Sequence, residues 1–210
     1  MSGGSSSYGV IRQAFERAAD ALVDVVGLIG DEQWDQPSLG EWTVQELVGH
    51  CGRAFSTVVR FVDEPATTLD VPDVGSYYRL AMSVPGVHDA VAQRGRDAGV
   101  ALGDDQVATV LEWRAGALAA IEGCTGDEVG ATAGGSMMLS EYLRTRIVEL
   151  VVHTMDLVEA IGADLPDFGA AGGVALSAVV EVASDGEQQA TILRALLGRD
   201  PLPPRFNLFG

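Results

Sequence analysis

The amino-acid sequence predicts an all-α protein, an up-and-down bundle of four main helices with additional helices at its C-terminal end. Three observations lead to this prediction. Apolar residues recur at the spacing of an α-helix along most of the 210 residues. No segment shows the convincing alternation of apolar and polar residues that is typical of a half-buried strand. Ala, Val, Leu and Gly are abundant and aromatic residues make up only 6% of the chain, which favours closely packed helices.

The first predicted helix runs from about Tyr8 to Ile29 and ends where Gly30 and Asp31 interrupt the apolar pattern. Apolar side chains recur on one face of this helix at intervals of three and four residues. These positions are Ile11, Phe15, Ala18, Leu22, Val25 and Val26. The residues before the helix, 1–7, are rich in Gly and Ser and are expected to form a flexible tail.

The second predicted helix opens with Thr43, three residues before Glu46. A Thr and a Glu at this spacing can form a capping box, in which each side chain accepts a hydrogen bond from the other residue's backbone N–H. The apolar pattern of the helix fades by Pro65. Its core-facing positions are Val44, Leu47, Val48, Cys51, Phe55, Val58 and Val62.

The middle of the chain contains two further predicted helical stretches. The stretch over residues 77–101 includes Pro85 and Gly86, so a break or kink is expected there. Asp104 is placed to cap the next helix. The Gly-rich segment over residues 123–135 is predicted to be a loop that lines an opening.

The last main helix is predicted from Ser140 to Ile161, with Gly162 well placed as its C-terminal stop. Two shorter helices are expected over residues 170–184 and 187–197, followed by an extended, Pro-rich tail.

The chain is therefore expected to form one metal-binding bundle over residues 8–162, preceded by the tail of residues 1–7. Residues 163–210 are expected to form a short helical extension packed on the bundle. No internal repeat or earlier interdomain linker is visible in the sequence.

Composition and charge exclude several functional classes. A hydrophobic fraction of 47% excludes a disordered chain, and the net charge of −17 repels nucleic acid and anionic lipid. No apolar run approaches the ~18–20 uncharged residues that a membrane span needs. The N-terminal residues lack the basic cluster and apolar core of a signal peptide, and only Cys51 and Cys124 are present. We therefore expect a soluble, cytoplasmic protein without a disulfide framework.

A polar stripe on the last main helix carries the first candidate metal ligands. His153 follows Glu149 by four residues, so the two side chains lie one above the other on the helix surface. Arg146 and Asp156 extend this stripe by one turn in each direction. The stripe borders the apolar face of the helix, where the core meets the surface. Such a pair alone can equally be an ordinary surface pair.

His50 occupies the same kind of border position on the second helix, beside the apolar face that contains Cys51. Two antiparallel helices of a bundle can bring such borders together. Imidazole and carboxylate groups are good ligands for zinc (Zn²⁺), Ni²⁺ or Fe²⁺, and three protein ligands leave a position for water or substrate. The prediction is a divalent-metal site formed by His50, Glu149 and His153. The alternative for a lone border histidine is a satisfied packing residue.

Cys51 is the one cysteine that adjoins a candidate ligand. Its side chain points about 100° away from that of His50 and into the apolar face, since successive helical residues differ by about that angle. We expect a buried, inert thiol. The sequence also contains no Gly-x-Ser-x-Gly elbow, phosphate-binding loop or dinucleotide-binding fingerprint.

Two blocks of sequence resemble the mycothiol-dependent maleylpyruvate isomerase family, which belongs to the DinB-like superfamily of four-helix bundles. Residues 34–50 read WDQPSLGEWTVQELVGH and resemble the entry to that family's first metal helix. Residues 141–156 read EYLRTRIVELVVHTMD and resemble its second metal helix. The closing LRALLGRDPLP over residues 193–203 also looks like the end of many members. The resemblance extends from about residue 8 to residue 205.

The resemblance implies a bundle that holds one divalent metal, usually zinc, through His50, Glu149 and His153. It also implies activation of a low-molecular-weight thiol, mycothiol, for S-transfer to a small electrophile or for its cis–trans isomerisation. Arg79 and Arg146 are candidates for binding a substrate carboxylate or sugar hydroxyls. Both can equally be ordinary surface arginines. No catalytic residue beyond the metal ligands is expected.

The sequence departs from the isomerase in one respect, because only about fifty residues follow His153 and a substantial C-terminal domain is not expected. The maleylpyruvate substrate is therefore not implied with the metal site. Two other classes stay open. One is a metal-dependent hydrolase that cleaves an amide or ester. The other is a non-catalytic metal-binding or ligand-binding bundle, acting alone or as a homodimer.

Overall fold

The computed structural model describes residues 4–184 and 188–208. Within this part of the chain the predicted all-α architecture is confirmed, with one short two-stranded hairpin in addition. The helices are α1 (Gly4–Val26), α2 (Val44–Asp63), α3 (Val74–Met82), α4 (Val87–Ala101), α5 (Gln106–Ala120), α6 (Leu139–Ile161), α7 (Ala170–Ser184) and α8 (Gln189–Leu196). The strands are β1 (Val129–Thr132) and β2 (Gly135–Met138).

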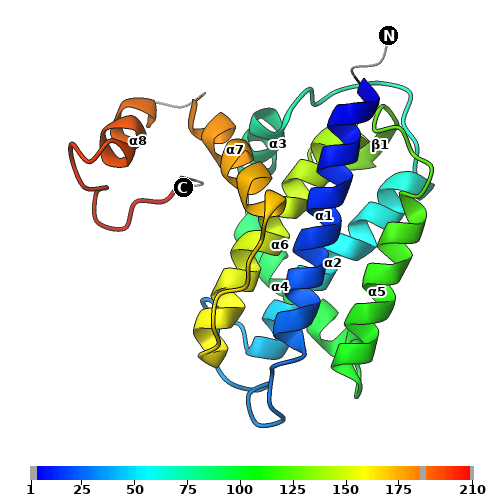
Figure 1. Ribbon diagram of the computed structural model, residues 1–210, viewed down its shortest axis with the longest axis vertical. Coiled ribbons are helices and arrows are strands. Elements are labelled where there is room, and N and C mark those ends of the chain that lie inside the picture. The colour runs from blue at the N-terminus through cyan, green and yellow to red at the C-terminus, as the bar shows by residue number, and fades with distance from the viewer. Residues whose placement is uncertain (1–3, 185–187, 209–210) are drawn as a thin grey trace.

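Helices α1, α2, α5 and α6 form the four-helix bundle (Figure 1). Helix α1 packs between α6 and α5, and α2 packs against the same two neighbours from the other side. Helix α4 packs against α2, and α7 covers α1 and α6. The centre of the core is fully buried and includes Phe15 of α1, Phe55 of α2 and Ile147 of α6. Phe15 and Phe55 meet edge to face, with ring centroids 6.3 Å apart.

Helix α2 begins where the capping box predicted it. The Thr43 hydroxyl accepts a hydrogen bond from the Glu46 backbone N–H at 3.2 Å, and Glu46 Oε2 accepts from the Thr43 N–H at 2.9 Å. Two of the unpaired backbone donors at this helix end are therefore satisfied. This fixes the position of the first residue of α2 and hence the direction in which each later side chain points.

Helices α2 and α4 approach each other closely because glycines face each other at their crossing. A Cβ atom added at Gly49 would lie 2.2 Å from the backbone nitrogen of Gly99. Gly52 lies under the ring of Trp113 from α5, and a Cβ there would lie 2.4 Å from two ring carbons. The close packing of helices that the composition predicted therefore depends on glycines at specific contacts between helices.

Several predicted boundaries need correction. Helix α1 begins at Gly4, within the predicted tail of residues 1–7, whereas residues 1–3 lie outside the described part of the chain. The predicted break at Pro85 and Gly86 is confirmed, since α3 ends at Met82 and α4 begins at Val87. Asp105, rather than Asp104, caps α5 by accepting a hydrogen bond from the Ala108 N–H at 3.0 Å.

The prediction that residues 123–135 form only a loop was wrong. The segment contains β1, which pairs antiparallel with β2 in the register Val129 opposite Met138. Four residues are too few to show a period of two, so the pattern did not reveal the strands. The hairpin also binds a distant segment, because the Asp70 N–H donates to the Ser136 carbonyl oxygen at 3.0 Å.

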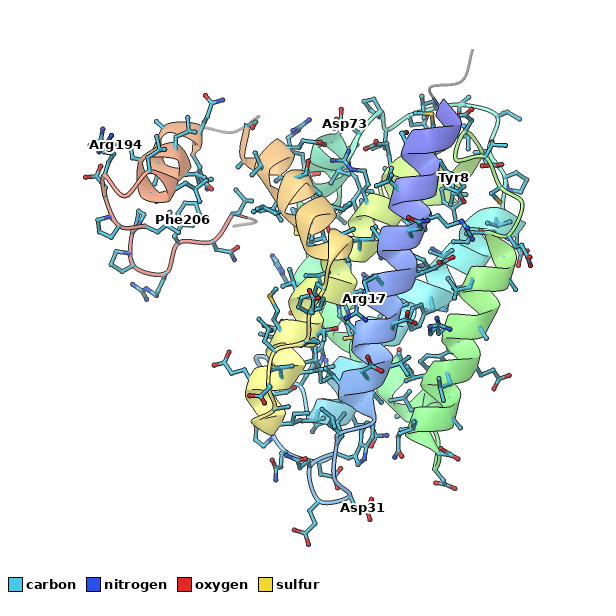
Figure 2. All side chains as sticks on the ribbon, in the orientation of Figure 1. Tyr8, Arg17, Asp31, Asp73, Arg194 and Phe206 are labelled. Carbon is cyan, nitrogen blue, oxygen red and sulfur yellow. The ribbon has the colours of Figure 1, made fainter. Side chains whose placement is uncertain are left out.

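The C-terminal extension consists of two helices with different surroundings. Helix α7 packs against α1 and α6, and its Ala171 and Ala178 are fully buried, whereas the expected packing of the whole extension on the bundle does not extend to its second helix. No residue of α8 is buried. Figure 2 shows Arg194 of α8 and Phe206 of the following tail on a segment that stands to the side of the bundle. Among the described residues, no helix is long and apolar enough to cross a membrane.

The α2–α4 contact gives the first testable prediction. Gly49→Ala is expected to lower the free energy of unfolding by about 1–3 kcal/mol, because the added methyl group would overlap the α4 backbone. Gly116→Ala is the matched control, since a Cβ at this α5 position would meet nothing within 4 Å. The control is expected to gain about 0.5–1 kcal/mol from helix propensity. Denaturant titration measures both values, and equal stability of the two variants would contradict the close approach of α2 and α4.

Candidate metal centre

The structure brings His50, Glu149 and His153 together between α2 and α6. One carboxylate oxygen, Glu149 Oε2, lies 3.5 Å from His50 Nε2 and 3.5 Å from His153 Nε2. One ligand atom from each residue falls within 4.8 Å of the others. The two imidazole rings are 4.8 Å apart and nearly perpendicular, at 81°. Three donor atoms of the kinds that bind divalent transition metals therefore converge on one point.

The helix positions of these residues explain why they meet. Glu149 and His153 are four residues apart on α6 and share one flank, as their spacing predicted. His50 faces them from α2. Farther along the same two helices, the ring of Phe61 stacks on the ring of Tyr142, with ring centroids 4.8 Å apart. The residue numbers rise on α2 as they fall on α6, so the two helices are antiparallel. The polar borders of both helices consequently lie against each other.

Burial separates this cluster from an ordinary surface pair. The side chains of His50, His153 and Glu149 are 11%, 17% and 23% exposed. A carboxylate removed this far from water requires compensating partners. The cluster still reaches the surface, since none of the three side chains is sealed in the core. Each of the three side chains therefore keeps a small part of its surface in contact with solvent.

Neighbouring side chains orient two of the three candidate ligands. Asp156 Oδ2 lies 2.9 Å from His153 Nδ1, which leaves His153 Nε2 directed at the centre of the cluster. The Tyr78 hydroxyl donates to Glu149 Oε1 at 3.2 Å, which leaves Oε2 for the two histidines. Partners of this kind fix ring and carboxylate orientation in metal sites. Sequence patterns did not reveal Tyr78, because it reaches Glu149 from a helix seventy-one positions away in the chain.

Trp42 supports the third candidate ligand, and the sequence did not identify it either. Its ring packs against the His50 ring at 4.6 Å and an angle of 32°. Trp42 Nε1 donates to the Ala92 carbonyl oxygen at 3.0 Å, so α4 holds the indole in place. The His50 ring is thereby confined between Trp42 and His153.

Burial and the charges of neighbouring groups shift the pKa values of all three residues of the cluster. Burial acts to raise the pKa of Glu149, but hydrogen bonds from His153 and His50 and the charge of Arg146 hold this pKa well below its usual value. Burial acts to lower the pKa of His153, but Asp156 and Glu149 outweigh it and raise this pKa to about 9. Burial dominates at His50 and lowers its pKa. These shifts favour an anionic Glu149, a protonated His153 and a neutral His50.

The two arginines proposed as substrate contacts lie in different environments. Arg146 is 9% exposed, one turn from Glu149, with its guanidinium 4.9 Å from the centre of the Tyr142 ring. It donates to the Tyr77 hydroxyl at 3.3 Å. Arg79 is exposed on α3 and donates to Ser76 Oγ at 3.0 Å. The structure therefore places Arg146, and not Arg79, in the buried surroundings of the candidate metal centre.

Cys51 is fully buried, as its helix position predicted. Burial, reinforced by the negative charges of Asp156 and Glu149, raises the pKa of this thiol well above its usual value. The thiolate, the reactive form of cysteine, is therefore disfavoured at this position.

Comparisons with known proteins identify the chain's family. The family model of the mycothiol maleylpyruvate isomerase N-terminal domain matches residues 15–158, which include all three candidate ligands. The crystal structure of the mycothiol-dependent maleylpyruvate isomerase is similar over 84% of this chain and 67% of that chain, with 17% sequence identity and a TM-score of 0.48. No curated protein sequence matches. Because the family model covers well over half of the sequence, the chain belongs to the mycothiol maleylpyruvate isomerase N-terminal domain family.

Proposed function

We propose that this protein is a cytoplasmic, divalent-metal-dependent enzyme that activates mycothiol for S-transfer to a small electrophile, or for the electrophile's cis–trans isomerisation. The observation that carries the proposal is the convergence of two imidazole nitrogens on a single oxygen of Glu149. Membership of the family supports mycothiol as the thiol. The electrophile in this proposal is a small molecule with a carbon that a thiolate can attack.

The donor set fits a divalent transition metal, most simply Zn²⁺, with Ni²⁺ or Fe²⁺ as alternatives. His50, Glu149 and His153 would hold the ion through two neutral imidazoles and one carboxylate. Asp156 and Tyr78 already orient His153 and Glu149 as the outer partners of metal ligands do. A bound divalent cation would lower the pKa of a thiol beside it, so that the thiol is ionised near neutral pH.

The chain's own residues perform the remaining tasks in this proposal. Asp156 accepts the Nδ1 proton of His153 and holds that ring in place. Arg146 lies beside Glu149 without a direct ion pair, and its charge stabilises the carboxylate anion. The buried Cys51 supplies no nucleophile, so the attacking sulfur comes from the co-substrate. The protein thus binds, orients and excludes water, while the thiol forms the new bond.

The first test of the proposal is metal content. Purified protein is expected to hold about one divalent metal ion per chain, as three-ligand catalytic sites do. His50→Ala and His153→Ala are expected to lose most of it, because each removes one of three donors. His88→Ala changes the remaining histidine, which is exposed on α4, and should retain the full amount. Elemental analysis measures the metal content of each protein. Full retention of the metal in both His50→Ala and His153→Ala would refute the assignment of these residues as metal ligands.

The second test concerns the identity of the thiol. Metal-loaded protein is expected to accelerate the reaction of mycothiol with a generic electrophile, and 2-mercaptoethanol should react far more slowly. Selectivity must come from contacts to the sugar and cysteinyl groups, because a metal ion by itself would activate any thiol. Chelated protein is the control and should be inactive.

Equal rates with both thiols would exclude a mycothiol-specific site. Cleavage of an amide or ester without any thiol requirement would instead favour the hydrolase. Inactivity with every thiol and electrophile would favour a non-catalytic binding protein.

Cys51→Ala provides the third test. Its thiol-transfer rate is expected to equal that of the unmodified protein, because Cys51 is buried and its thiol protonated. Cys124→Ala, at a half-buried position, is the matched control. Turnover with saturating thiol measures the effect, alongside metal content and thermal unfolding. Lost turnover in a folded, metal-loaded Cys51→Ala protein would show that this thiol takes part in the reaction.

A further inference from the structure

A cavity lies between α2, α4 and α5, apart from the candidate metal ligands. Its volume is about 340 Å³, which is within the range of small-molecule sites. Arg53 and Ser56 of α2, Arg94 and Asp97 of α4, and Trp113 of α5 line it, together with two alanines. None of the three candidate metal ligands belongs to this lining, although Arg53 is one helical turn from His50.

The two arginines of this cavity form no ion pair with any described residue. Neither guanidinium takes part in a hydrogen bond or ion pair there, whereas Arg144 contacts both Glu141 and Glu181. Arg53 is half-buried. Burial, followed by the positive charges of Arg94, Arg146 and Arg60, lowers its pKa. A partly desolvated cation among other cations is costly unless an anion joins it.

Asp97 places one negative charge in the lining against the two positive charges of Arg53 and Arg94, and it pairs with neither arginine. Its Oδ1 accepts a hydrogen bond from Gln93 Nε2 at 2.8 Å along the exposed side of α4, and it makes no ion pair in the described chain. Local positive charge is unexpected in a protein whose net charge is −17. The local charge balance of the cavity therefore favours an anion.

Trp113 gives the cavity an apolar wall. Its ring lies against the α2 backbone at Gly52, where even a methyl group would lie 2.4 Å from two ring carbons. This contact fixes the ring between α2 and the cavity. An aromatic surface beside two arginines suits a ligand with an anionic end and a flat or apolar body.

We propose that this cavity binds a small organic oxyanion, with its carboxylate or phosphate group on Arg53 and Arg94 and its apolar part against Trp113. Guanidinium groups bind both kinds of oxyanion through paired N–H donors, so the two share one recognition chemistry. The site is separate from the metal ligands and does not depend on the proposed thiol reaction. Its test therefore uses direct binding.

Isothermal titration calorimetry with inorganic phosphate and with benzoate tests the proposal on the full-length protein. Arg53→Met is expected to weaken binding of the preferred anion about tenfold or more, the loss typical of a charge-assisted hydrogen bond. Arg60→Met removes the same charge from an exposed position on α2 outside the cavity and should change affinity far less. Trp113→Leu should weaken benzoate and leave phosphate unchanged. Tighter binding of one probe identifies the anion as a carboxylate or a phosphate.

Two further variants make the result decisive. His153→Ala removes a candidate metal ligand and should bind the anion as the unmodified protein does, which excludes binding at a metal ion. Arg94→Met, at an exposed position, repeats the test if Arg53→Met does not fold. Absence of binding by both probes would overturn the proposal. So would equal losses in Arg53→Met and Arg60→Met, or loss of binding in His153→Ala.

Discussion

The partly buried carboxylate of Glu149 is the constraint around which the site is arranged. A carboxylate with limited access to water must be compensated, and here the compensation comes from three helices. His50 approaches from α2, His153 from the next turn of α6, and Tyr78 from α3. Each partner can reach Glu149 only if its helix is correctly placed and rotated. The electrostatic requirement of one residue is thereby linked to the packing of the whole bundle.

Glycine contacts allow the helices to reach these positions. The α2–α4 crossing places Gly49 against the Gly99 backbone, and no larger side chain fits there without a shift. The same approach brings Trp42 to the Ala92 carbonyl oxygen and presses its ring against His50. Helix α4 thus orients the candidate ligand His50 indirectly, through the Trp42 ring that it holds. The glycine contacts between α2 and α4 therefore support both the packing of the bundle and the geometry of the candidate metal centre.

Charge is distributed unevenly over this acidic protein. Arg144 forms ion pairs with carboxylates on α6 and α7, as expected for a partly buried cation. Arg146 lies between tyrosine rings beside the candidate metal centre, and Arg53 faces a cavity with Arg94. Because a guanidinium stays charged at all physiological pH values, these positions keep a fixed positive potential.

The sequence by itself determined the helical architecture, the start of α2 and the three residues of the candidate metal centre. The apolar period, the Thr43–Glu46 spacing and the four-residue interval from Glu149 to His153 each act within one helix. His50 was predicted from its position at the border of the apolar face of α2 and from the antiparallel arrangement expected in a bundle. Membership of the family agrees with the resemblance of the two sequence blocks.

Only the tertiary structure decided which residues surround those ligands. Tyr78 contacts Glu149 from a separate helix. Trp42 lies just before α2 and packs against His50, with its indole held by the Ala92 carbonyl oxygen of α4. The apolar period of a helix encodes neither contact. The hairpin of β1 and β2 also depends on a distant segment that binds Ser136. Contacts between separate elements also decide the different environments of the two candidate arginines. Helical periodicity describes Arg79 and Arg146 alike, but the neighbouring elements bury one beside Glu149 and leave the other exposed.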